Sequence, residues 1–243
     1  MRKLLIGIAL VPGMLVAQTP SANQILDRID RNMASTSRIF SASMMVHAAR
    51  GERTMEMKIW SQGDKRSFTE YLSPAREKGT KMLKLDDQLW MFSPSADRII
   101  QITGHMLRQS VMGSDLSYED MMDDRKLTDI YTATLIGPDN LDDRPCWVLE
   151  LRAKAEDVAY FRRKMWIDQE RNIPLKEEWY AKAGKLLKQT TLSDVKKIDG
   201  RWFPTKMVYK DMLKTGGGTE FIINDIQFDV PIPESVFSKA ALR

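Results

Sequence analysis

The feature that most constrains the fold is a long series of short strand-like runs. Between Ile39 and Phe228, apolar and polar residues alternate with a period of two, and clusters of Gly, Pro, Asn or Asp separate the runs. Short connections of this kind join antiparallel neighbours. The runs do not alternate with long helical patterns, so a parallel α/β fold is not expected. The sequence predicts about a dozen antiparallel strands in a sheet that must curl, split or close.

Two segments are expected to lie across this sheet. The first is a helix over Gln24–Ser35, for which Ser21 or Asn23 can serve as the N-cap. The second is residues 105–124, which interrupt the strand pattern with apolar residues, a glycine and several acids. The helix carries one apolar stripe that can pack on a sheet, formed by Ile25, Leu26, Ile29 and Met33.

Two glycine-containing stretches are predicted to be turns. Residues 137–140 (GPDN) follow a strand predicted over Tyr131–Ile136. Residues 216–218 (GGG) precede the last strand, which is predicted over Phe221–Phe228 and is followed by prolines and a short closing turn at Glu234–Phe237.

The N-terminus has the layout of a secretory signal peptide. Arg2 and Lys3 precede an apolar run over Leu4–Val16, and Ala17 is a small residue at a plausible cleavage point, although cleavage as late as Ala22 fits too. An uncleaved membrane anchor is the alternative. No Cys follows the run, so a lipid-anchored protein is not expected. Residues 18–243 are expected to form a single soluble domain.

Composition narrows the classes of partner. The 243 residues include one Cys, so no intramolecular disulfide can form, and Cys146 is interpreted as a small buried hydrophobe rather than a reactive thiol. The net charge is +4, and the charges are interleaved in sign. Nucleic acid is therefore not an expected partner. An ordinary solvated surface is favoured over one that binds an anionic membrane.

The residue patterns of common enzyme sites are missing from the sequence. The two histidines, His47 and His105, are far apart, and no metal-binding spacing or GxSxG motif occurs. A hydrolase triad of Ser110 or Ser114 with Asp115 and His105 would lack a strained strand-to-helix elbow for the nucleophile. The sequence predicts a protein that is not an enzyme and that has no metal and no cofactor.

Methionine is abundant, with 16 residues, many of them in strand-like runs. Its flexible thioether chain adapts to ligands of variable shape, but it is also an ordinary core filler, and both interpretations stay open.

Several motifs resemble the outer-membrane lipoprotein-sorting protein family, the LolA-like proteins. The most specific is residues 112–120 (MGSDLSYED), which is similar to the family's MGSDFSYEDL signature with Leu116 in place of Phe. The similarity covers nearly all of the mature chain, with further matches at Tyr71–Pro74, Lys78–Gly79, Trp90, Ser93–Pro94, Arg98, Trp166–Asp168, Pro174, Gly184 and Lys188.

This resemblance implies a mainly β protein with a few helices. Its fold would be a large curved antiparallel sheet, an unclosed β-barrel, covered by helices and located in the periplasm. The implied function is a carrier that binds acyl chains of lipoproteins, or another lipid, for transfer towards the outer membrane. Implied partners are an inner-membrane transporter and an outer-membrane acceptor, and we expect a monomer. The alternative is a periplasmic interaction or sensor module that docks on a membrane transporter or regulator without transported cargo.

The alternating strands supply candidates for a lipid-binding cavity. In the first half these are Phe40, Met44, Met55, Met57, Ile59, Phe68, Leu83, Trp90, Phe92, Ile100 and Ile102. In the strand around Trp90 and Phe92, either alternating set of side chains could face the cavity, because Leu89 and Met91 are apolar as well. The second half adds Trp147, Leu149, Met165, Trp179 and Met207.

The signature residues are interpreted as a lid over the cavity, formed by Met112, Gly113, Ser114, Asp115, Tyr118, Glu119 and Asp120. We expect Ser114 or Asp115 to cap a short helix, with Tyr118 and the acids fixing its position like a latch. A rigid corner without motion is the alternative. The acids Asp115, Glu119, Asp120, Asp123 and Asp124 could also bind a cation, pair with Arg98, Arg108 and Arg125, or simply be solvated.

Overall fold

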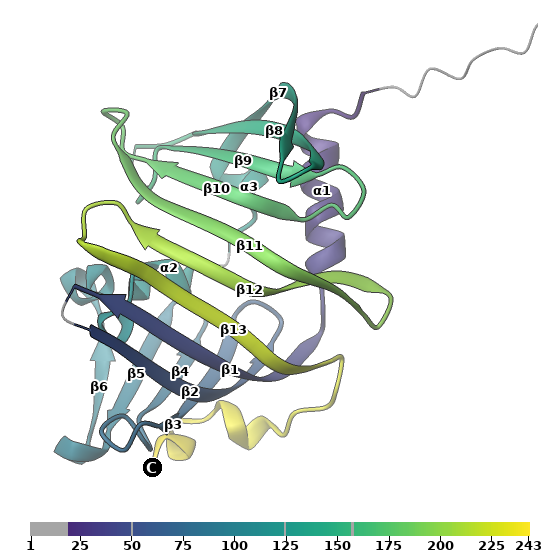
Figure 1. Cartoon of the computed structure of the whole chain (residues 1–243). Helices are drawn as coiled ribbons and strands as arrows, with labels where there is room; N and C mark the ends of the chain where they lie inside the picture. Colours follow the sequence, from purple (N-terminus) through teal and green to yellow (C-terminus); the bar gives the residue numbers. More distant parts are fainter. Residues whose placement is uncertain (1–18, 50, 124, 157) are drawn as a thin grey trace, which may run out of the picture.

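The computed structural model describes residues 19–49, 51–123, 125–156 and 158–243 (Figure 1). The predicted signal peptide over residues 1–17 lies outside this part of the chain. None of the helices in the described part is both long and apolar enough to cross a membrane.

The described residues form a thirteen-stranded antiparallel sheet that is not closed. Its order is β6-β5-β4-β3-β2-β1-β13-β12-β11-β10-β9-β8-β7, so β6 and β7 are the two edges. The mainly β, unclosed architecture predicted from the sequence is confirmed. The strands are β1 (Ser37–Ala48), β2 (Gly51–Gln62), β3 (Arg66–Ser73), β4 (Lys81–Leu85), β5 (Gln88–Ser93), β6 (Arg98–Ile102), β7 (Tyr131–Leu141), β8 (Arg144–Ala153), β9 (Arg162–Asp168), β10 (Pro174–Tyr180), β11 (Leu186–Ile198), β12 (Arg201–Asp211) and β13 (Gly216–Phe228).

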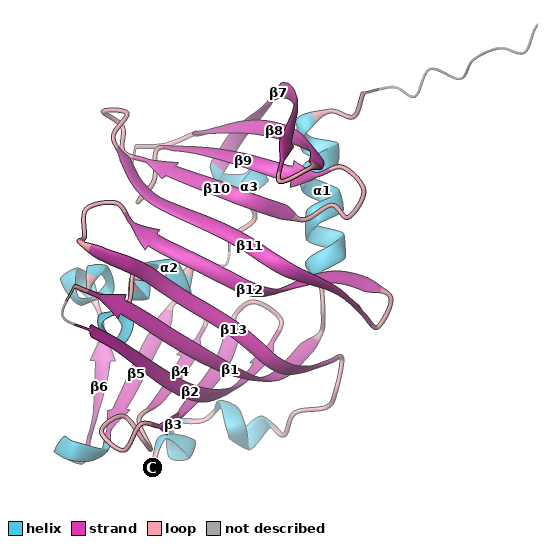
Figure 2. Ribbon diagram, in the orientation of Figure 1, coloured by secondary structure: helices cyan, strands magenta, loops and turns pink. Residues whose placement is uncertain are grey.

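The sheet curls, so that β3 to β6 fold behind β1, β2 and β13 (Figure 1). Helices α1 and α2 lie on the concave side, which we call the inner face (Figure 2). The C-terminal segment packs on the opposite, outer face. The helices are α1 (Ala22–Met33), α2 (Tyr118–Met122) and α3 (Leu127–Ile130), and the short 3₁₀ turns are η1 (Pro94–Ala96), η2 (Gly104–Arg108), η3 (Val111–Gly113), η4 (Glu234–Phe237) and η5 (Lys239–Leu242).

Helix α1 begins where its sequence provides a cap. The Ser21 hydroxyl accepts from the amide of Gln24, and the Gln24 side chain accepts from the amide of Ser21, which is a capping box. Ser21 is therefore the cap, one of the two predicted. The helix starts two residues earlier than predicted and ends at Met33 instead of Ser35.

The apolar stripe of α1 covers one half of the inner face. Ile25, Leu26 and Ile29 pack in one buried cluster with residues of β7, β8 and β9. In this half of the molecule, the helix excludes water from the sheet as the period of the stripe predicts.

The predicted turn at residues 137–140 is wrong. Strand β7 continues to Leu141, and the turn lies at Asp142 and Asp143, whose φ angles of 47° and 60° are those of a two-residue type I′ hairpin. A register shift between Leu135 and Gly137 identifies a β-bulge, which the glycine signalled. Pro138 is tolerated because β7 is an edge strand.

The predicted turn at residues 216–218 is also wrong, because these glycines begin β13. A Cβ atom on Gly216 would lie 2.5 Å from the carbonyl oxygen of His47 on β1. Glycine is needed here for close approach of two backbones within the sheet rather than for chain reversal.

The outer face of β3, β4 and β5 is covered by the C-terminal segment. Ile232, Phe237 and Leu242 share a buried cluster with side chains of these strands. The ammonium of Lys81 donates to the carbonyls of Ala241 and Arg243, both at 3.1 Å. The short turn predicted at Glu234–Phe237 is η4, whereas the sequence pattern did not indicate η5 or α3.

Replacing Leu26 by alanine should lower the free energy of unfolding by about 2–4 kcal/mol, because it leaves a cavity under α1. Leu26 is 2% exposed. Urea denaturation followed by tryptophan fluorescence measures the change. The matched control is Ile136→Ala, since Ile136 is 60% exposed and its truncation should have little effect.

A single unfolding transition is expected from one domain, and two separate transitions would contradict that expectation.

Candidate functional site

The segment that interrupts the strand series lies across the inner face of β1, β2, β5 and β6. We call residues 103–123 the cover segment; it contains η2, η3 and α2. Val111 and Tyr118 are buried in a cluster with Met44 and Met57 of the sheet. Further contacts to this cluster come from Met106, Leu107, Met112, Leu116 and Met122.

Seven of the predicted cavity residues lie in this cluster, beneath the cover segment: Phe40, Met44, Met55, Met57, Ile59, Ile100 and Ile102. Three others, Trp147, Leu149 and Met165, pack beneath α1 instead. Met207 contacts the cluster of Phe203 and Ile223 in the middle of the sheet. The inner face is therefore apolar in both halves, and each half is covered by its own segment.

Four predicted cavity residues lie on the other side of the sheet. Phe68, Leu83 and Trp90 are buried beneath the C-terminal segment, and Phe92 packs beside them. They were expected on the concave side, but the cross-strand register places Phe68, Leu83 and Trp90 in one row on the outer face. Both faces of β4 and β5 are covered, so both alternating sets of side chains are apolar. The period-two pattern therefore does not show which set lies on the inner face. The residues that occupy the inner face instead are Tyr71, Met82, Leu89 and Met91.

The helix of the cover segment has a different cap from the one predicted. Ser117 is the N-cap of α2, and its hydroxyl accepts from the amide of Asp120 while the Asp120 carboxylate accepts from the amide of Ser117. The Ser-x-x-Asp spacing of residues 117–120 carried this signal. Neither Ser114 nor Asp115 caps α2.

Asp115 instead attaches the cover segment to the end of β12 and the start of β13. Its carboxylate accepts from the hydroxyl of Thr219 at 2.7 Å and from the amide of Asp211 at 2.9 Å. Its own amide donates to the Thr219 hydroxyl at 2.9 Å. Asp115 is 7% exposed and Thr219 is fully buried, so these hydrogen bonds are shielded from water.

Asp120 makes the second attachment, in the middle of the inner face. Its carboxylate pairs with the ammonium of Lys188 and accepts from the hydroxyl of Tyr160 at 2.6 Å. Burial alone would raise the pKa of this carboxyl. The positive charge of Lys188 lowers it, and so do the hydrogen bonds from Lys188, from Tyr160 and from the Ser117 amide. The pKa is therefore below its ordinary value. The carboxylate is therefore charged at neutral pH.

Arg53 of β2 makes a third attachment, which the sequence analysis did not identify. Its guanidinium donates to the carbonyl of Met112 and, at 2.9 Å, to the carboxylate of Glu77. Met112 has a φ of 49° and Gly113 one of 75°, so the chain turns sharply where Arg53 reaches it. Nothing in the local pattern of β2 distinguishes Arg53 from an ordinary solvated residue.

The alternatives for the acidic cluster can now be compared. Asp123 pairs with Arg125 at 3.2 Å, whereas Asp120 pairs with Lys188 rather than with any of the predicted arginines. Asp124 lies outside the described residues. Within the described ranges, no group of three or more His, Cys, Asp or Glu could hold a metal ion. The imagined triad is not assembled, since Asp115 bonds to Thr219 and His105 is exposed in η2.

A cleft of about 670 Å³ opens beside α2. Glu119, Asp120 and Met122 line one wall, and Trp179 and Arg163 lie on the sheet side. The indole of Trp179 donates to Glu177 at 3.0 Å and packs against Tyr160, with ring centroids 4.8 Å apart.

Arg163 forms a buried ion pair with Glu177 at 2.5 Å. Burial would lower the pKa of Arg163, but the Glu177 carboxylate and the Tyr131 hydroxyl raise it, so the guanidinium stays charged. Charged side chains therefore line this cleft between α2 and the sheet. A second cleft of about 400 Å³ borders Phe40 and Ile59.

A family model with the description "Uncharacterized protein" matches residues 63–243. No curated protein matches the chain. Among solved structures, a DUF1329 family protein from Desulfovibrio piger is 26% identical, with a TM-score of 0.82 over 90% of this chain and 96% of that one. An outer membrane lipoprotein-sorting protein domain from Vibrio parahaemolyticus is 23% identical, with a TM-score of 0.79 over 90% and 96% of the two chains.

A LolA superfamily protein from Nitrosomonas europaea is 25% identical, with a TM-score of 0.74 over 92% of this chain and all of that one. The match of the family model spans well over half of the chain, and the fold is shared with these structures over at least 90% of the chain. The chain belongs to the family that this model describes, and it is LolA-like in fold, as its sequence motifs predict.

Proposed function

We propose that the protein is a periplasmic carrier that binds an acyl chain, of a lipoprotein or of another lipid, against its inner face. It would receive the chain from an inner-membrane transporter and deliver it, as a monomer, to an acceptor at the outer membrane. The chain's own residues bind and shield the lipid and do no covalent chemistry. The observation that carries this proposal is the apolar, methionine-rich inner face beneath the cover segment.

Methionines line both sides of this contact. Met44, Met55 and Met57 lie on the sheet, and Met106, Met112 and Met122 lie on the cover segment. Methionine is unbranched and flexible, so it can pack against a neighbouring segment or against an acyl chain of variable length. A face that exchanges one apolar partner for another is suited to a carrier.

The energetics of such an exchange are nearly balanced. Removing a CH₂ group from water stabilises a complex by about 0.8 kcal/mol. A lipid that moves from a membrane to the protein does not gain this free energy, because its chain was already in an apolar environment. The protein must therefore offer a face that water cannot reach and that opens at small cost, which a displaceable cover segment provides.

The attachments of the cover segment are compatible with displacement. Asp115, Asp120 and Arg53 hold it by hydrogen bonds and ion pairs, and no disulfide can form because Cys146 is the chain's single cysteine. These polar contacts can re-form after the segment moves, so they support the latch interpretation of the signature residues.

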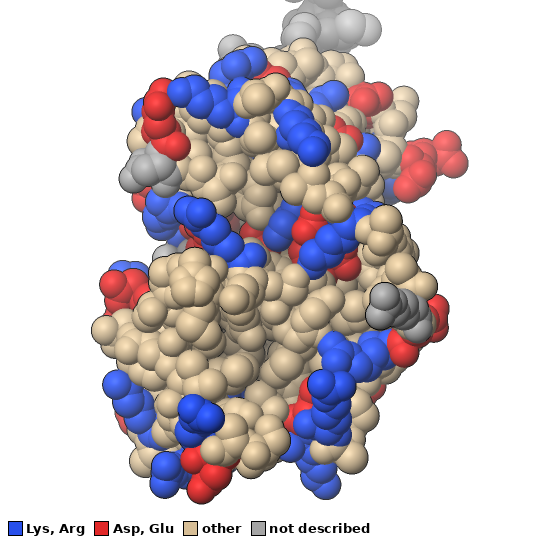
Figure 3. All heavy atoms as spheres, turned by 90° about the vertical axis from the view of Figure 1, so that its left-hand side faces the viewer, with Lys and Arg blue, Asp and Glu red and all other residues tan. Residues whose placement is uncertain are grey.

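A second candidate function is a docking module, which would bind a membrane transporter or regulator without transporting cargo. One observation favours it. The turn after β12 exposes two large apolar side chains, Met212 at 43% and Leu213 at 57%. It lies on the side of the molecule shown in Figure 3, where the turn between β1 and β2 and the start of the cover segment also lie. Exposed apolar residues at a turn are suited to contact with another protein.

Native mass spectrometry of the protein from its own periplasm, followed by organic extraction, tests the carrier. We expect a co-purifying lipid or acylated peptide, released on denaturation, or else saturable uptake of a fluorescent fatty-acyl probe by the purified protein. A protein that arrives without a ligand and takes up no probe would rule out the carrier and leave the docking module.

The variant Asp120→Asn should speed the uptake of a fluorescent acyl probe several-fold, because it removes the ion pair that holds α2 against Lys188. Stopped-flow fluorescence gives the rate. The control is Glu156→Gln, which breaks an exposed pair with Lys182 away from both clefts and should leave the rate close to that of the wild type. Equal rates in both variants would contradict the latch.

The stability provided by this latch should depend on pH in a defined direction. The pKa of Asp120 is lowered in the folded protein, so its ion pair contributes stability that is fully present above the ordinary value of 3.8 and is lost as the pH falls through the lower, folded value. The unfolding free energies of the wild type and Asp120→Asn should therefore differ at pH 7 and converge in strong acid. Urea denaturation at several pH values measures both, and a difference that grows below pH 3.8 would contradict the assignment.

A further inference from the structure

The turn between β12 and β13, residues 212–215, presents two adjacent apolar side chains to water. Met212 is 43% exposed and Leu213 is 57% exposed, and we call them the apolar pair. In the part of the chain that the structure describes, no other two sequence neighbours are large, apolar and this exposed. Single exposed apolar residues are common, whereas two together at the tip of a turn indicate a contact surface.

The turn between β10 and β11, residues 181–185, lies beside this one. The amide of Met212 donates to the carbonyl of Leu187 at 2.8 Å, and Lys188 near the start of β11 pairs with Asp211 at the end of β12. Both turns lie on the left-hand side of Figure 1. Figure 3 faces this side, where basic side chains border a broad uncharged area.

Lysine is concentrated around the apolar pair, although charges of both signs are interleaved along the whole chain. Four lysines lie in or beside the two turns: Lys182, Lys185, Lys210 and Lys214. Two carboxylates accompany them, with Glu156 at 2.5 Å from Lys182 and Asp211 at 3.8 Å from Lys214. The group therefore keeps a net positive charge.

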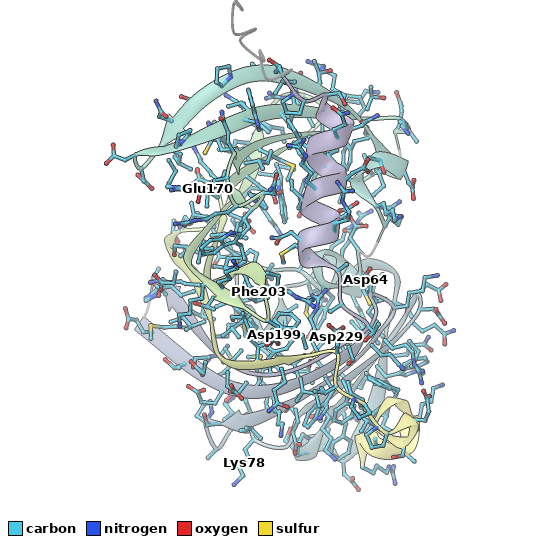
Figure 4. The ribbon with its side chains drawn as sticks, turned by 90° about the vertical axis from the view of Figure 1, so that its right-hand side faces the viewer. Asp64, Lys78, Glu170, Asp199, Phe203 and Asp229 are labelled. Carbon is cyan, nitrogen blue, oxygen red and sulfur yellow. The ribbon has the colours of Figure 1, made fainter. Side chains whose placement is uncertain are left out.

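The opposite ends of the strands are acidic. Because consecutive strands are antiparallel neighbours, alternate turns lie at the same end of the sheet. The five turns that join β2–β3, β4–β5, β7–β8, β9–β10 and β11–β12 hold seven acids and two basic residues. Asp64, Glu170 and Asp199 are three of these acids (Figure 4). An anionic surface would repel this end of the molecule and attract the end that carries the apolar pair.

An apolar pair among lysines fits an anionic lipid surface better than a protein. A stable protein interface buries about 800 Å² on each partner, far more than two side chains provide. Two apolar side chains can enter a lipid layer directly, and each nearby lysine adds attraction to anionic head groups.

The same turn also holds the cover segment. The amide of Asp211 donates to the carboxylate of Asp115 at 2.9 Å. The ammonium of Lys214 donates to the Ser110 hydroxyl at 2.5 Å and to the Ser114 carbonyl at 2.6 Å. Both of these acceptors of Lys214 are neutral. A lipid phosphate is a stronger acceptor because it is charged, so it would compete with the cover segment for Lys214.

We propose that the β12–β13 turn docks the protein on an anionic lipid surface and thereby loosens the cover segment. The apolar pair enters the acyl region, and Lys214 exchanges its neutral acceptors on the cover segment for a lipid phosphate. The surface binds the loosened state more tightly, so it shifts the protein towards that state. This inference rests on the proposed carrier function and specifies the surface at which cargo is exchanged.

Co-sedimentation with lipid vesicles tests the docking. The wild type should bind vesicles of phosphatidylethanolamine and phosphatidylglycerol more tightly than vesicles of phosphatidylcholine. The double variant Met212→Ser/Leu213→Ser should weaken this binding about tenfold or more, because it removes the inserted side chains. Lys185→Glu should weaken binding to the anionic vesicles alone. The matched control is Ile136→Ser, which removes an apolar side chain that is 60% exposed on β7 and should bind as the wild type does.

Hydrogen exchange tests the loosening. Anionic vesicles should speed exchange of the amides of residues 110–118 in the wild type and leave it unchanged in the double variant. Equal vesicle binding by the wild type and the double variant, or unchanged exchange in the vesicle-bound wild type, would overturn the proposal. Binding to membranes of the source cells that is lost when those membranes are treated with protease, without binding to pure lipid, would also overturn it and assign the turn to a protein partner.

Uptake of a fluorescent acyl probe in solution separates this inference from the carrier function. The wild type and the double variant should take up the probe equally, because the apolar pair lies outside the lipid-binding face. If vesicle binding fails while uptake persists, the docking turn is wrong and the carrier stands. If neither protein takes up the probe, the carrier function fails and the exchange of cargo at this surface fails with it.

Discussion

The constraint on which the structure depends is that an open, curled sheet must cover its apolar faces with segments of its own chain. A closed barrel would pair its edges, but here β6 and β7 remain as edges, and both faces carry apolar side chains. Helix α1 covers one half of the inner face, the cover segment covers the other, and the C-terminal segment covers the outer face of β3 to β5. Each of these three segments covers a different part of the sheet, so one segment can move without exposing the parts that the other two cover.

The covers differ in how they are held. Helix α1 has an apolar stripe and buries Ile25 and Leu26 almost completely, so hydrophobic burial accounts for its position. The cover segment buries Val111 and Tyr118, and polar contacts of Asp115 and Asp120 hold it in addition. Buried ion pairs contribute little net stability, because desolvation offsets their attraction, but they specify one arrangement. The apolar contacts of the cover segment thus provide burial, and its polar contacts specify its position on the sheet.

The sequence predicted the parts of the fold that a single period determines. The stripe of α1 and the period-two strands were found because each of these elements has one covered face. The phase of β4 and β5 could not be predicted, since the C-terminal segment makes their outer face apolar too, and Phe68, Leu83, Trp90 and Phe92 were assigned to the wrong side. Gly137 and Gly216 were interpreted as turns because glycine permits a bulge or a close backbone approach as readily as a reversal. Ser117 was missed although its spacing to Asp120 was visible, whereas Arg53 depends on a contact that only tertiary structure creates.

Cross-strand register brings Arg38, Ser61, Ser67 and Lys84 into one polar row on the inner face of β1 to β4, which no run of residues along one strand reveals. Arg38 and Lys84 are 46 positions apart in the sequence. A charge on the covered face of a sheet costs free energy unless a partner compensates it, so its presence there requires a reason. Hydrogen bonds to Met33 and Met122 orient the two cations, and Ser61 and Ser67 complete the row between them. These hydrogen-bond partners come from outside the strands that carry Arg38 and Lys84, so the position of each cation is determined by tertiary structure and not by its local sequence.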